Sequence, residues 1–306
     1  MYPKQRGLHR QAFARTSLIL IQRRKMRKLG ILLLTILAFI GCGDDKADSH
    51  IESNTQTQDK AELTILRVGA TPVPAAEILE FIKPQMKAQG VEMQIQQFTD
   101  YVVPNVSLAE GSSDANMYQH KPFMDKTNEQ KGYHLVALAP IYIVPLGFYS
   151  NKFKNIDEFP QGATIAIPGD ASNMARAFIL LHDNGVITLN DAKNLSASEL
   201  DSVENPKGLV FKPLEAAGLP KVLDSVDGAV INANYALQAQ MSIKESLFHE
   251  NDKSAYVNVL VSREDNQNDE RIAVLKNALL SDETRAFILS KYEGQILPAA
   301  QDSTKE

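Results

Sequence analysis

The chain has 306 residues and a single cysteine, and its 32 basic side chains are outnumbered by 37 acidic ones, a formal charge of −5. Nine of the basic residues and no acidic residue lie in residues 1–41, so residues 42–306 carry 23 basic against 37 acidic side chains, a formal charge of −14. Nucleic-acid binding needs clustered Lys or Arg, so this acidic body excludes nucleic acid as an expected partner. The lone cysteine excludes an internal disulfide.

Residues 1–41 have the pattern of a signal peptide. A basic cluster at residues 23–28 precedes an apolar run at residues 29–40, which is too short to span a bilayer comfortably. Met26 also fits a true start, in which case residues 1–25 are an over-long beginning of the chain. We therefore expect residues 1–41 to be removed from the mature protein.

Cys42 directly follows the apolar run, and the segment Phe39-Ile40-Gly41-Cys42 resembles a bacterial lipobox, in which the cysteine is lipidated and becomes the first residue. Residues 42–61 are then a lipidated end followed by a polar, flexible tether. The alternative is a cleaved secretory signal with an incidental cysteine. A lipid at Cys42 predicts a protein of the cell envelope that faces the periplasm or the exterior. The choice between inner and outer membrane stays open, because an aspartate comes only at Asp44.

The body begins with the pattern of a parallel sheet. Residues 64–70 form an apolar run that predicts a strand, and Ile78, Leu79 and Ile82 then recur on one face of a helix. Apolar and polar residues alternate over residues 91–96, which is typical of a half-buried strand. Strand, helix and strand in this order predict a right-handed βαβ unit.

Residues 114–125 concentrate aromatic and polar side chains in one short segment. Pro122 suits the first turn of a helix, so we expect Tyr118 and His120 in the loop that enters it and Phe123 inside its first turn. Such loops are where α/β proteins place ligands. The alternative is a surface turn whose aromatic side chains are tucked into the core.

The second half of the chain repeats the α/β pattern. After a loop at residues 101–105 and a short helix, strands are expected at residues 135–139, 141–149, 163–167, 229–232 and 256–261, with helices at 174–183, 268–280 and 282–293. The length suffices for two lobes, which we place at residues 62–144 plus 256–306 and at residues 145–255. The prediction is an α/β protein with two crossovers and a cleft between the lobes.

No motif in the chain indicates catalysis, a metal or a cofactor. The six histidines lack metal-ligand spacing, and there is no CxxC, HExxH, P-loop, GxGxxG or GxSxG sequence. We therefore expect a protein that is not an enzyme and that uses no cofactor. The alternative is a small-molecule hydrolase using His120 with Asp114 or Asp125, although no nucleophile is paired with it.

Several polar and aromatic side chains at strand and helix ends have the chemistry of a binding site. Arg176 is expected in the first turn of the helix at residues 174–183, beside Asn173, where it could clamp a carboxylate with two parallel hydrogen bonds. Asn232 ends an apolar strand, and its amide can serve a carboxylate or an ammonium. Tyr101 could join Tyr118 and Phe123 as the wall of an apolar slot. An exposed Arg, an Asx turn and core aromatics are the alternatives.

These residues stand in segments that together resemble the methionine-binding lipoproteins of ABC importers, the NLPA-type family. The similarity runs from about Leu66 to Tyr292 and is carried by residues 98–105, 114–123, 166–170 with Asn173 and Arg176, 203–207, 214–217, 229–235 and 261–265. The resemblance implies a two-lobed periplasmic-binding-protein fold of type II. The ligand residues that it implies are Tyr101, Tyr118, His120, Phe123, Asn173, Arg176 and Asn232.

The resemblance also implies a function. The chain would be a monomeric, lipid-anchored receptor that captures methionine and delivers it to the membrane and ATPase subunits of an ABC importer. Phe123, Met174-Ala175 and Thr71-Pro-Val-Pro-Ala75 depart from the family pattern, which leaves L-methionine, D-methionine and a short methionine peptide open. The alternatives are a receptor for another small amino acid or a sulfonate, and a surface lipoprotein with a mainly adhesive or host-contact role.

Overall fold

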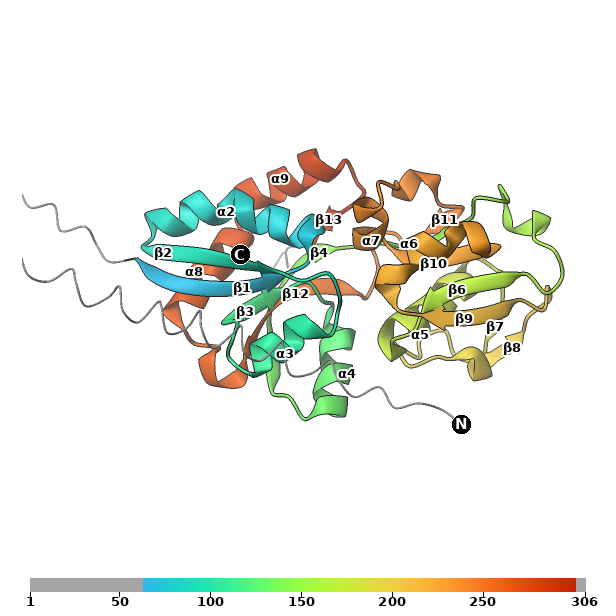
Figure 1. Cartoon of the computed structure of the whole chain (residues 1–306), viewed down its shortest axis with the longest axis horizontal. Coiled ribbons are helices and arrows are strands. Elements are labelled where there is room, and N and C mark those ends of the chain that lie inside the picture. Colours follow the sequence, from blue (N-terminus) through green and yellow to red (C-terminus); the bar gives the residue numbers. More distant parts are fainter. Residues whose placement is uncertain (1–62, 301–306) are drawn as a thin grey trace, which may run out of the picture. The chain divides into compact units, whose positions relative to one another are not determined.

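The computed structural model describes residues 63–300 (Figure 1). The expected signal peptide at residues 1–41, the lipidated Cys42 and the tether that follows it lie outside the described residues. Within residues 63–300, no helix has both the length and the apolar composition that crossing a membrane requires.

Two separate sheets form the framework, and the first has six strands. Its central strand β1 pairs in parallel with β2 on one side and with β3 on the other, and α2 connects β1 to β2, as the sequence predicts for a βαβ unit. The later strand β12 returns to this sheet and runs antiparallel to both β3 and β4. In spatial order the strands are β2 (Val91–Gln97), β1 (Thr64–Ala70), β3 (Ala115–Met117), β12 (Val257–Arg263), β4 (Leu135–Ile143) and β13 (Leu297–Pro298).

The second sheet has five strands, and its β6 pairs in parallel with β9 and β10. In spatial order the strands are β9 (Val210–Leu214), β6 (Thr164–Pro168), β10 (Gly228–Asn232), β5 (Leu146–Tyr149) and β11 (Phe248–His249), and β7 (Thr188–Leu189) and β8 (Ser202–Glu204) form a separate pair.

The helices form two groups, according to the sheet that they accompany. Those with the first sheet are η1 (Pro72–Ala76), α2 (Glu77–Ala88), α3 (Val103–Ala109), α4 (Lys121–Lys131), α8 (Glu270–Leu279) and α9 (Asp282–Tyr292). Those with the second are α5 (Ala171–Asp183), α6 (Leu219–Val222) and α7 (Ala233–Gln238). Single turns of 3-10 helix are η2 (Ile156–Glu158), η3 (Glu199–Asp201), η4 (Ala216–Gly218), η5 (Leu223–Ser225), η6 (Ile243–Glu245) and η7 (Glu264–Asn266). The two closing helices of the sequence analysis are confirmed as α8 and α9.

One predicted strand is wrong. Residues 141–149 were expected to form a single strand, but residues 141–143 end β4 in the first sheet and residues 146–149 form β5 in the second. Pro145 lies at the break, and a proline removes the backbone donor that a continuous ladder needs. The chain therefore leaves the first sheet at residues 144–145 and returns to it through residues 250–256.

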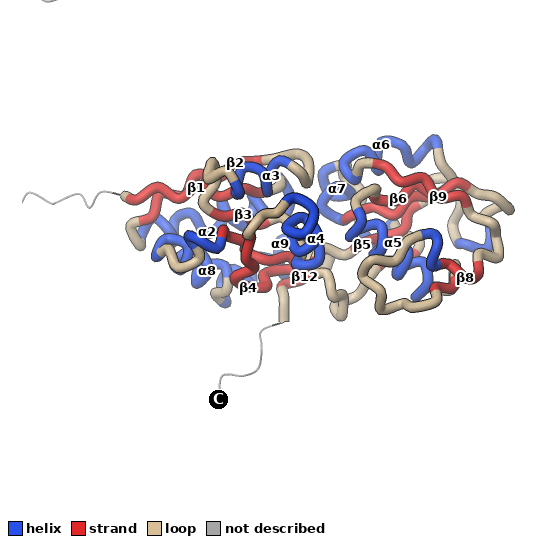
Figure 2. Tube along the Cα trace, turned by 90° about the horizontal axis from the view of Figure 1, so that it is seen from below, coloured by secondary structure: helices blue, strands red, loops and turns tan. Residues whose placement is uncertain are grey.

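These two connections give the two-lobed arrangement its boundaries. We propose that the lobes divide as the sequence suggests, at residues 62–144 plus 256–306 and at residues 145–255, because each set then contains one sheet. Figure 2 shows that the first-sheet helix α4 nevertheless approaches the second-sheet helix α5, and residues of the two helices are in contact.

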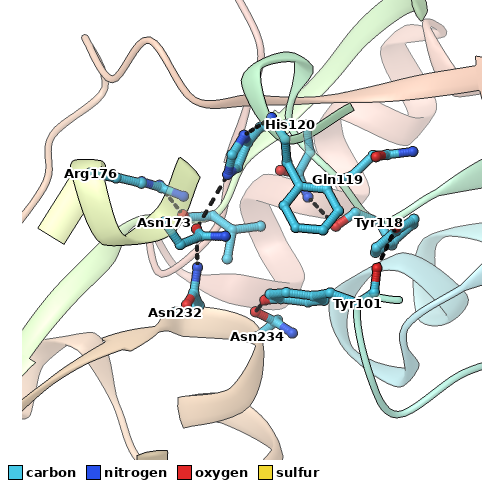
Figure 3. Close-up of a pocket in the computed structure, with 11 residues that line it drawn as sticks. Tyr101, Tyr118, Gln119, His120, Asn173, Arg176, Asn232 and Asn234 are labelled. Atoms are coloured by element: carbon cyan, nitrogen blue, oxygen red, sulfur yellow. Dashed lines mark hydrogen bonds between the residues drawn. The ribbon is translucent and has the colours of Figure 1, made fainter. Parts of the chain in front are cut away.

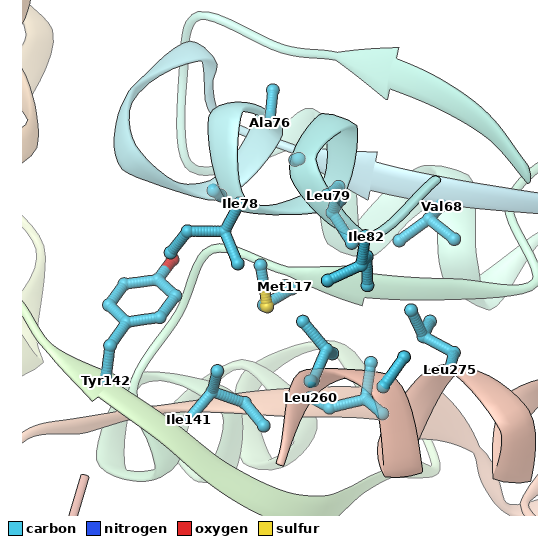
Figure 4. Close-up of a cluster of buried hydrophobic side chains, with 14 of the residues drawn as sticks. Val68, Ala76, Ile78, Leu79, Ile82, Met117, Ile141, Tyr142, Leu260 and Leu275 are labelled. Atoms are coloured by element: carbon cyan, nitrogen blue, oxygen red, sulfur yellow. The ribbon is translucent and has the colours of Figure 1, made fainter. Parts of the chain in front are cut away.

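Buried side chains form four clusters, two against the first sheet and two against the second. Figure 4 shows Leu79 and Ile82 of α2 with Leu260 of β12 and Leu275 of α8 in the first core. In the second sheet, Val230 faces one cluster while its neighbours Ala229 and Ile231 face the other. Successive strand residues point to opposite faces, so this sheet is covered on both sides, which explains its unbroken apolar strands.

A substitution of Gly228 can show how tightly the second sheet is packed. A Cβ at this position would lie 2.6 Å from Cζ of Phe148, whose ring is fully buried. We expect Gly228→Ala to lower the free energy of unfolding by about 1–3 kcal/mol, because overpacking forces neighbouring side chains to shift. Urea denaturation without ligand measures it. Gly218→Ala is the control, since no atom lies within 4 Å of its Cβ, and equal stability of the two variants would contradict the packing argument.

Candidate functional site

All seven residues that the sequence analysis selected line one cavity of about 300 Å³, part of which is open to solvent (Figure 3). Their roles toward a ligand remain predictions. The lining comes from both sheets and their helices: Tyr101, Tyr118, Gln119, His120, Phe123, Val144, Asn173, Arg176, Asn232, Asn234 and Asn258.

The start of α4 fixes the side chains that line the first-lobe wall. His120 is the N-cap of α4, and its Nδ1 accepts a hydrogen bond of 3.1 Å from the backbone N–H of Phe123. Pro122 occupies the first turn, where its missing N–H costs nothing. The expected positions of His120 before the helix and of Phe123 in its first turn are confirmed.

A buried amide cluster holds the loop in front of α4. Asn105 and Gln119 exchange two hydrogen bonds of 2.8 and 2.6 Å, and Asn116 donates to the Asn105 Oδ1 at 2.9 Å. All three side chains are buried. Because buried amides are costly unless they are paired, this cluster ties α3 to the loop that carries Tyr118 and His120.

The start of α5 differs from the prediction. The helix begins at Ala171 and not at residue 174, because Asp170 is the N-cap and its carboxylate accepts from the backbone N–H of Asn173 at 2.9 Å. Asp and Asn are equally good N-caps, so the sequence did not distinguish them. Arg176 therefore lies in the second turn, and the prediction that places it in the first turn is wrong.

A chain of hydrogen bonds runs from Asp170 to the cavity. The Nδ2 of Asn173 donates to the Asp170 carboxylate at 3.1 Å, so its Oδ1 faces the other way. That oxygen accepts from Asn232 Nδ2 at 2.8 Å and from His120 Nε2 at 3.2 Å. The ring of His120 carries its proton on Nε2, because Nδ1 already accepts. The remaining oxygen, Asn232 Oδ1, is buried and has no partner among the described residues.

Asn234, which is not one of the seven predicted binding residues, has an unpaired donor where Asn232 has an unpaired acceptor. Its Oδ1 accepts a bond of 2.6 Å from the Tyr101 hydroxyl, which leaves its buried Nδ2 without an acceptor in residues 63–300. The sequence signal was the pair Asn232 and Asn234 at the end of β10. The cavity thus offers one unpaired buried acceptor and one unpaired buried donor.

Arg176 is 2% exposed, and two of its three guanidinium nitrogens already donate hydrogen bonds. Its Nε donates to Glu250 Oε1 at 2.7 Å, while Nη2 donates to Glu250 Oε2 and, at 2.7 Å, to the carbonyl of Val144. The two hydrogens left of the five belong to Nη1, for which no partner is found among the described residues. In this arrangement Nε and Nη2 are not free for the expected two-bond clamp on a ligand, and only Nη1 is left. No sequence signal pointed to Glu250, which lies in a polar, acidic stretch typical of a surface loop.

Aromatic rings form the apolar side of the cavity. The ring centroids of Tyr101, Tyr118 and Phe123 are 5.9 to 6.3 Å apart in all three pairs. Burial raises the pKa of both tyrosines well above the usual range, so their hydroxyls stay neutral. The Tyr118 hydroxyl donates to the Tyr101 carbonyl at 2.9 Å, which turns it away from ligand recognition.

Residues 63–300 contain no group of three or more His, Cys, Asp or Glu side chains placed to hold a metal ion. Burial and, secondly, the charge of Arg176 lower the pKa of His120 to about 3, so the ring is neutral at physiological pH. The cavity therefore combines a neutral imidazole, neutral phenols and amides with one paired guanidinium.

The comparisons with known proteins agree with one another. Residues 66–300 match the NlpA lipoprotein family. The D-methionine-binding lipoprotein MetQ of Escherichia coli K12 is 37% identical over 256 residues, which are 82% of this chain and 89% of that protein. A nutrient binding protein from Burkholderia cenocepacia bound to methionine is 37% identical, with a TM-score of 0.74 over 77% of this chain and all of that one. Lipoprotein Tp32 from Treponema pallidum is 38% identical, with a TM-score of 0.74 over 77% of this chain and 99% of that one. These relatives share the two-lobed α/β fold, and their names describe lipoproteins and binding proteins rather than enzymes.

The neutral His120 should make stability depend on pH. In the unfolded chain an imidazole takes up a proton below about pH 6.5, whereas the folded ring stays neutral down to about pH 3. The unfolded state then binds more protons, so the free energy of unfolding should fall as the pH drops from 6.5 towards 3, by at most about 1.4 kcal/mol per pH unit. Urea denaturation between pH 4.5 and 7.5 measures it.

In His120→Gln this part of the pH dependence should disappear. His134→Gln is the control for removing a histidine, because the His134 side chain is 82% exposed. If His120→Gln loses stability with falling pH as steeply as the wild type, His120 is not the buried neutral ring described above.

Proposed function

The chain belongs to the NlpA lipoprotein family, and from this premise we propose that it is a lipid-anchored binding protein that captures methionine and delivers it to an ABC importer. The observation that carries the proposal is the cavity itself, which is lined by Arg176, by one residue with an unpaired acceptor and one with an unpaired donor, and by an aromatic wall. Polar groups that converge on a cavity beside aromatic side chains can orient a small molecule and give it specificity.

The polar atoms match the head group of an α-amino acid. The ligand ammonium would donate to Asn232 Oδ1, the unpaired acceptor. The carboxylate would accept from Arg176 Nη1 and from Asn234 Nδ2, the two donors that have no acceptor among the described residues. Both ends of the zwitterion would thereby satisfy groups that are costly to leave buried and unpaired.

The aromatic wall matches an apolar side chain that contains sulfur. Ring edges and faces meet at one side of the cavity, where they come from Tyr101, Tyr118 and Phe123. A thioether gains about 0.3–1.5 kcal/mol from each contact with an aromatic ring. His120 would act through Asn173, which it helps to orient by its hydrogen bond.

The named relatives support this ligand. One is described as binding D-methionine and another was solved with methionine bound. We propose methionine as the common core of the ligand, as the L or D form or in a short peptide. The family resemblance supports our proposal that the protein acts as a monomer in the cell envelope and delivers the ligand to the membrane and ATPase subunits of an importer.

Isothermal titration with an amino-acid panel tests the proposal. The protein from residue 43 onward should bind methionine more tightly than norleucine, which lacks the sulfur, and much more tightly than glutamate or lysine. Methioninol, which lacks the carboxylate, should bind about 100-fold more weakly than methionine, because Arg176 Nη1 and Asn234 Nδ2 lose their acceptor.

The carboxylate is removed from the ligand rather than Arg176 from the protein, because Arg176→Ala would leave Glu250 partly buried without its partner. Mass spectrometry of the ligand released from denatured protein identifies what the site carries after purification. Equal affinity for methionine, glutamate and lysine would refute the assignment.

The anchor can be tested separately, although Cys42 lies outside the described residues. A diacyl group is a two-chain anchor that holds stably, so Cys42→Ala should move the protein from the membrane to the soluble fraction. Methionine affinity should not change, because the first described strand begins at Thr64. Ser49→Ala, a change of similar size in the same segment, is the control and should stay with the membrane. Retention of Cys42→Ala in salt-washed membranes would require a different anchor.

A further inference from the structure

Glu250 is placed to set the charge of the cavity. It lies at the start of the connection from β11 to β12, and its side chain is 12% exposed. Its carboxylate accepts from Nε and Nη2 of Arg176, which lines the cavity, and from the backbone N–H of Leu146 at 3.0 Å. The single cation of the cavity lining is therefore neutralised before any ligand arrives.

A second carboxylate is connected with the proposed ammonium position through two amides. Asp170 accepts from Asn173, and Asn173 orients Asn232, whose Oδ1 faces the proposed ammonium position. The other titratable groups that face the pair of Arg176 and Glu250 are neutral, because burial lowers the pKa of His120 and raises that of Tyr256. The charges of Arg176 and Glu250 cancel, which leaves Asp170, a carboxyl whose pKa burial raises, behind the proposed ammonium position.

We propose that Glu250 is a specificity-determining residue that makes the site accept zwitterionic amino acids and reject carboxylates that lack an ammonium group. The inference rests on the proposed function. A zwitterion adds no net charge to the site, whereas a simple carboxylate adds a second negative charge beside Glu250. Few water molecules can screen that repulsion around a guanidinium that is 2% exposed.

Glu250 also has a geometric role that the test must separate from its charge. Its backbone N–H donates to the Leu146 carbonyl at 3.0 Å, so residue 250 joins the two connections between the sheets. A variant that merely loosens this junction should weaken every ligand alike. A change in the ratio of the two affinities reports the charge, because the two ligands differ only in the ammonium group and its proposed bond to Asn232, which the Glu250 variants leave in place.

The experiment compares methionine with 4-(methylsulfanyl)butanoate, its analogue without the amino group, by calorimetry and by competition. Wild-type protein should prefer methionine strongly. Glu250→Gln, which keeps the shape and an acceptor oxygen, should narrow the ratio of the two affinities by about tenfold or more, because one buried charge next to the ligand is removed. Glu250→Asp, which keeps the charge, should retain the wild-type ratio even where both affinities fall.

The Asp114 and Arg67 pair provides a matched control. Asp114 accepts from Nε and Nη2 of Arg67 at 3.1 and 2.8 Å and from a backbone N–H at 2.8 Å, and its side chain is 10% exposed. It therefore repeats the bonding of Glu250 away from the cavity lining. Asp114→Asn should leave both affinities and their ratio unchanged. If Glu250→Gln does not fold, Glu250→Ser, which admits water to the guanidinium, is measured in the same way.

The outcomes distinguish this inference from the proposed function. Failure of the wild-type protein to bind methionine overturns the proposed function, and the inference falls with it. Methionine binding with the same ratio in Glu250→Gln as in the wild type overturns the inference alone. If the ratio of the two affinities narrows in Glu250→Asp as much as in Glu250→Gln, Glu250 acts through its geometry and not through its charge. This result also overturns the inference.

Discussion

The buried guanidinium of Arg176 imposes the constraint on which the candidate site depends. A charge that is almost completely removed from water is tolerated only when it is paired and hydrogen-bonded. Its partners are Glu250 and the carbonyl of Val144, and each of them lies in one of the two connections between the sheets. Helix α5 is thereby held to both connections. Arg176, which we propose meets the ligand carboxylate, therefore also links the two segments in which the chain passes between the sheets.

Hydrogen-bond direction then decides what the cavity can recognise. The Asp170 carboxylate can only accept hydrogen bonds, so the amide of Asn173 directs its Nδ2 toward Asp170 and its Oδ1 toward Asn232. Asn232 then donates through its Nδ2, and the atom that it leaves without a partner is its Oδ1. The Tyr101 hydroxyl has the reverse effect on Asn234, whose free atom is a nitrogen. One acceptor and one donor therefore result from hydrogen bonds made within the protein, which is how a network of neutral amides can select a zwitterion.

Local sequence patterns predicted the parts of this site that depend on neighbouring residues. The βαβ unit and the placing of His120 before α4 follow from periodicity and capping, which act within a few residues. Glu250 pairs with Arg176 across 74 positions, and only the folded chain brings them together. The start of α5 was misplaced because Asp170 and Asn173 are both good caps, and the strand at residues 141–149 was not divided because the apolar run continues across Pro145.

The unpaired atoms also connect ligand binding with the arrangement of the two lobes. Asn232 and Asn234 belong to the second sheet and its helix α7, whereas Tyr101 and His120 come from the first lobe and contact them directly or through Asn173. Each buried polar atom without a partner costs about 1–3 kcal/mol. A ligand that supplies both partners removes these costs only while the two sets of residues are together, so its binding free energy favours this arrangement over any in which they separate. A ligand with one end missing would contribute to only one of the two bonds and would stabilise the arrangement correspondingly less.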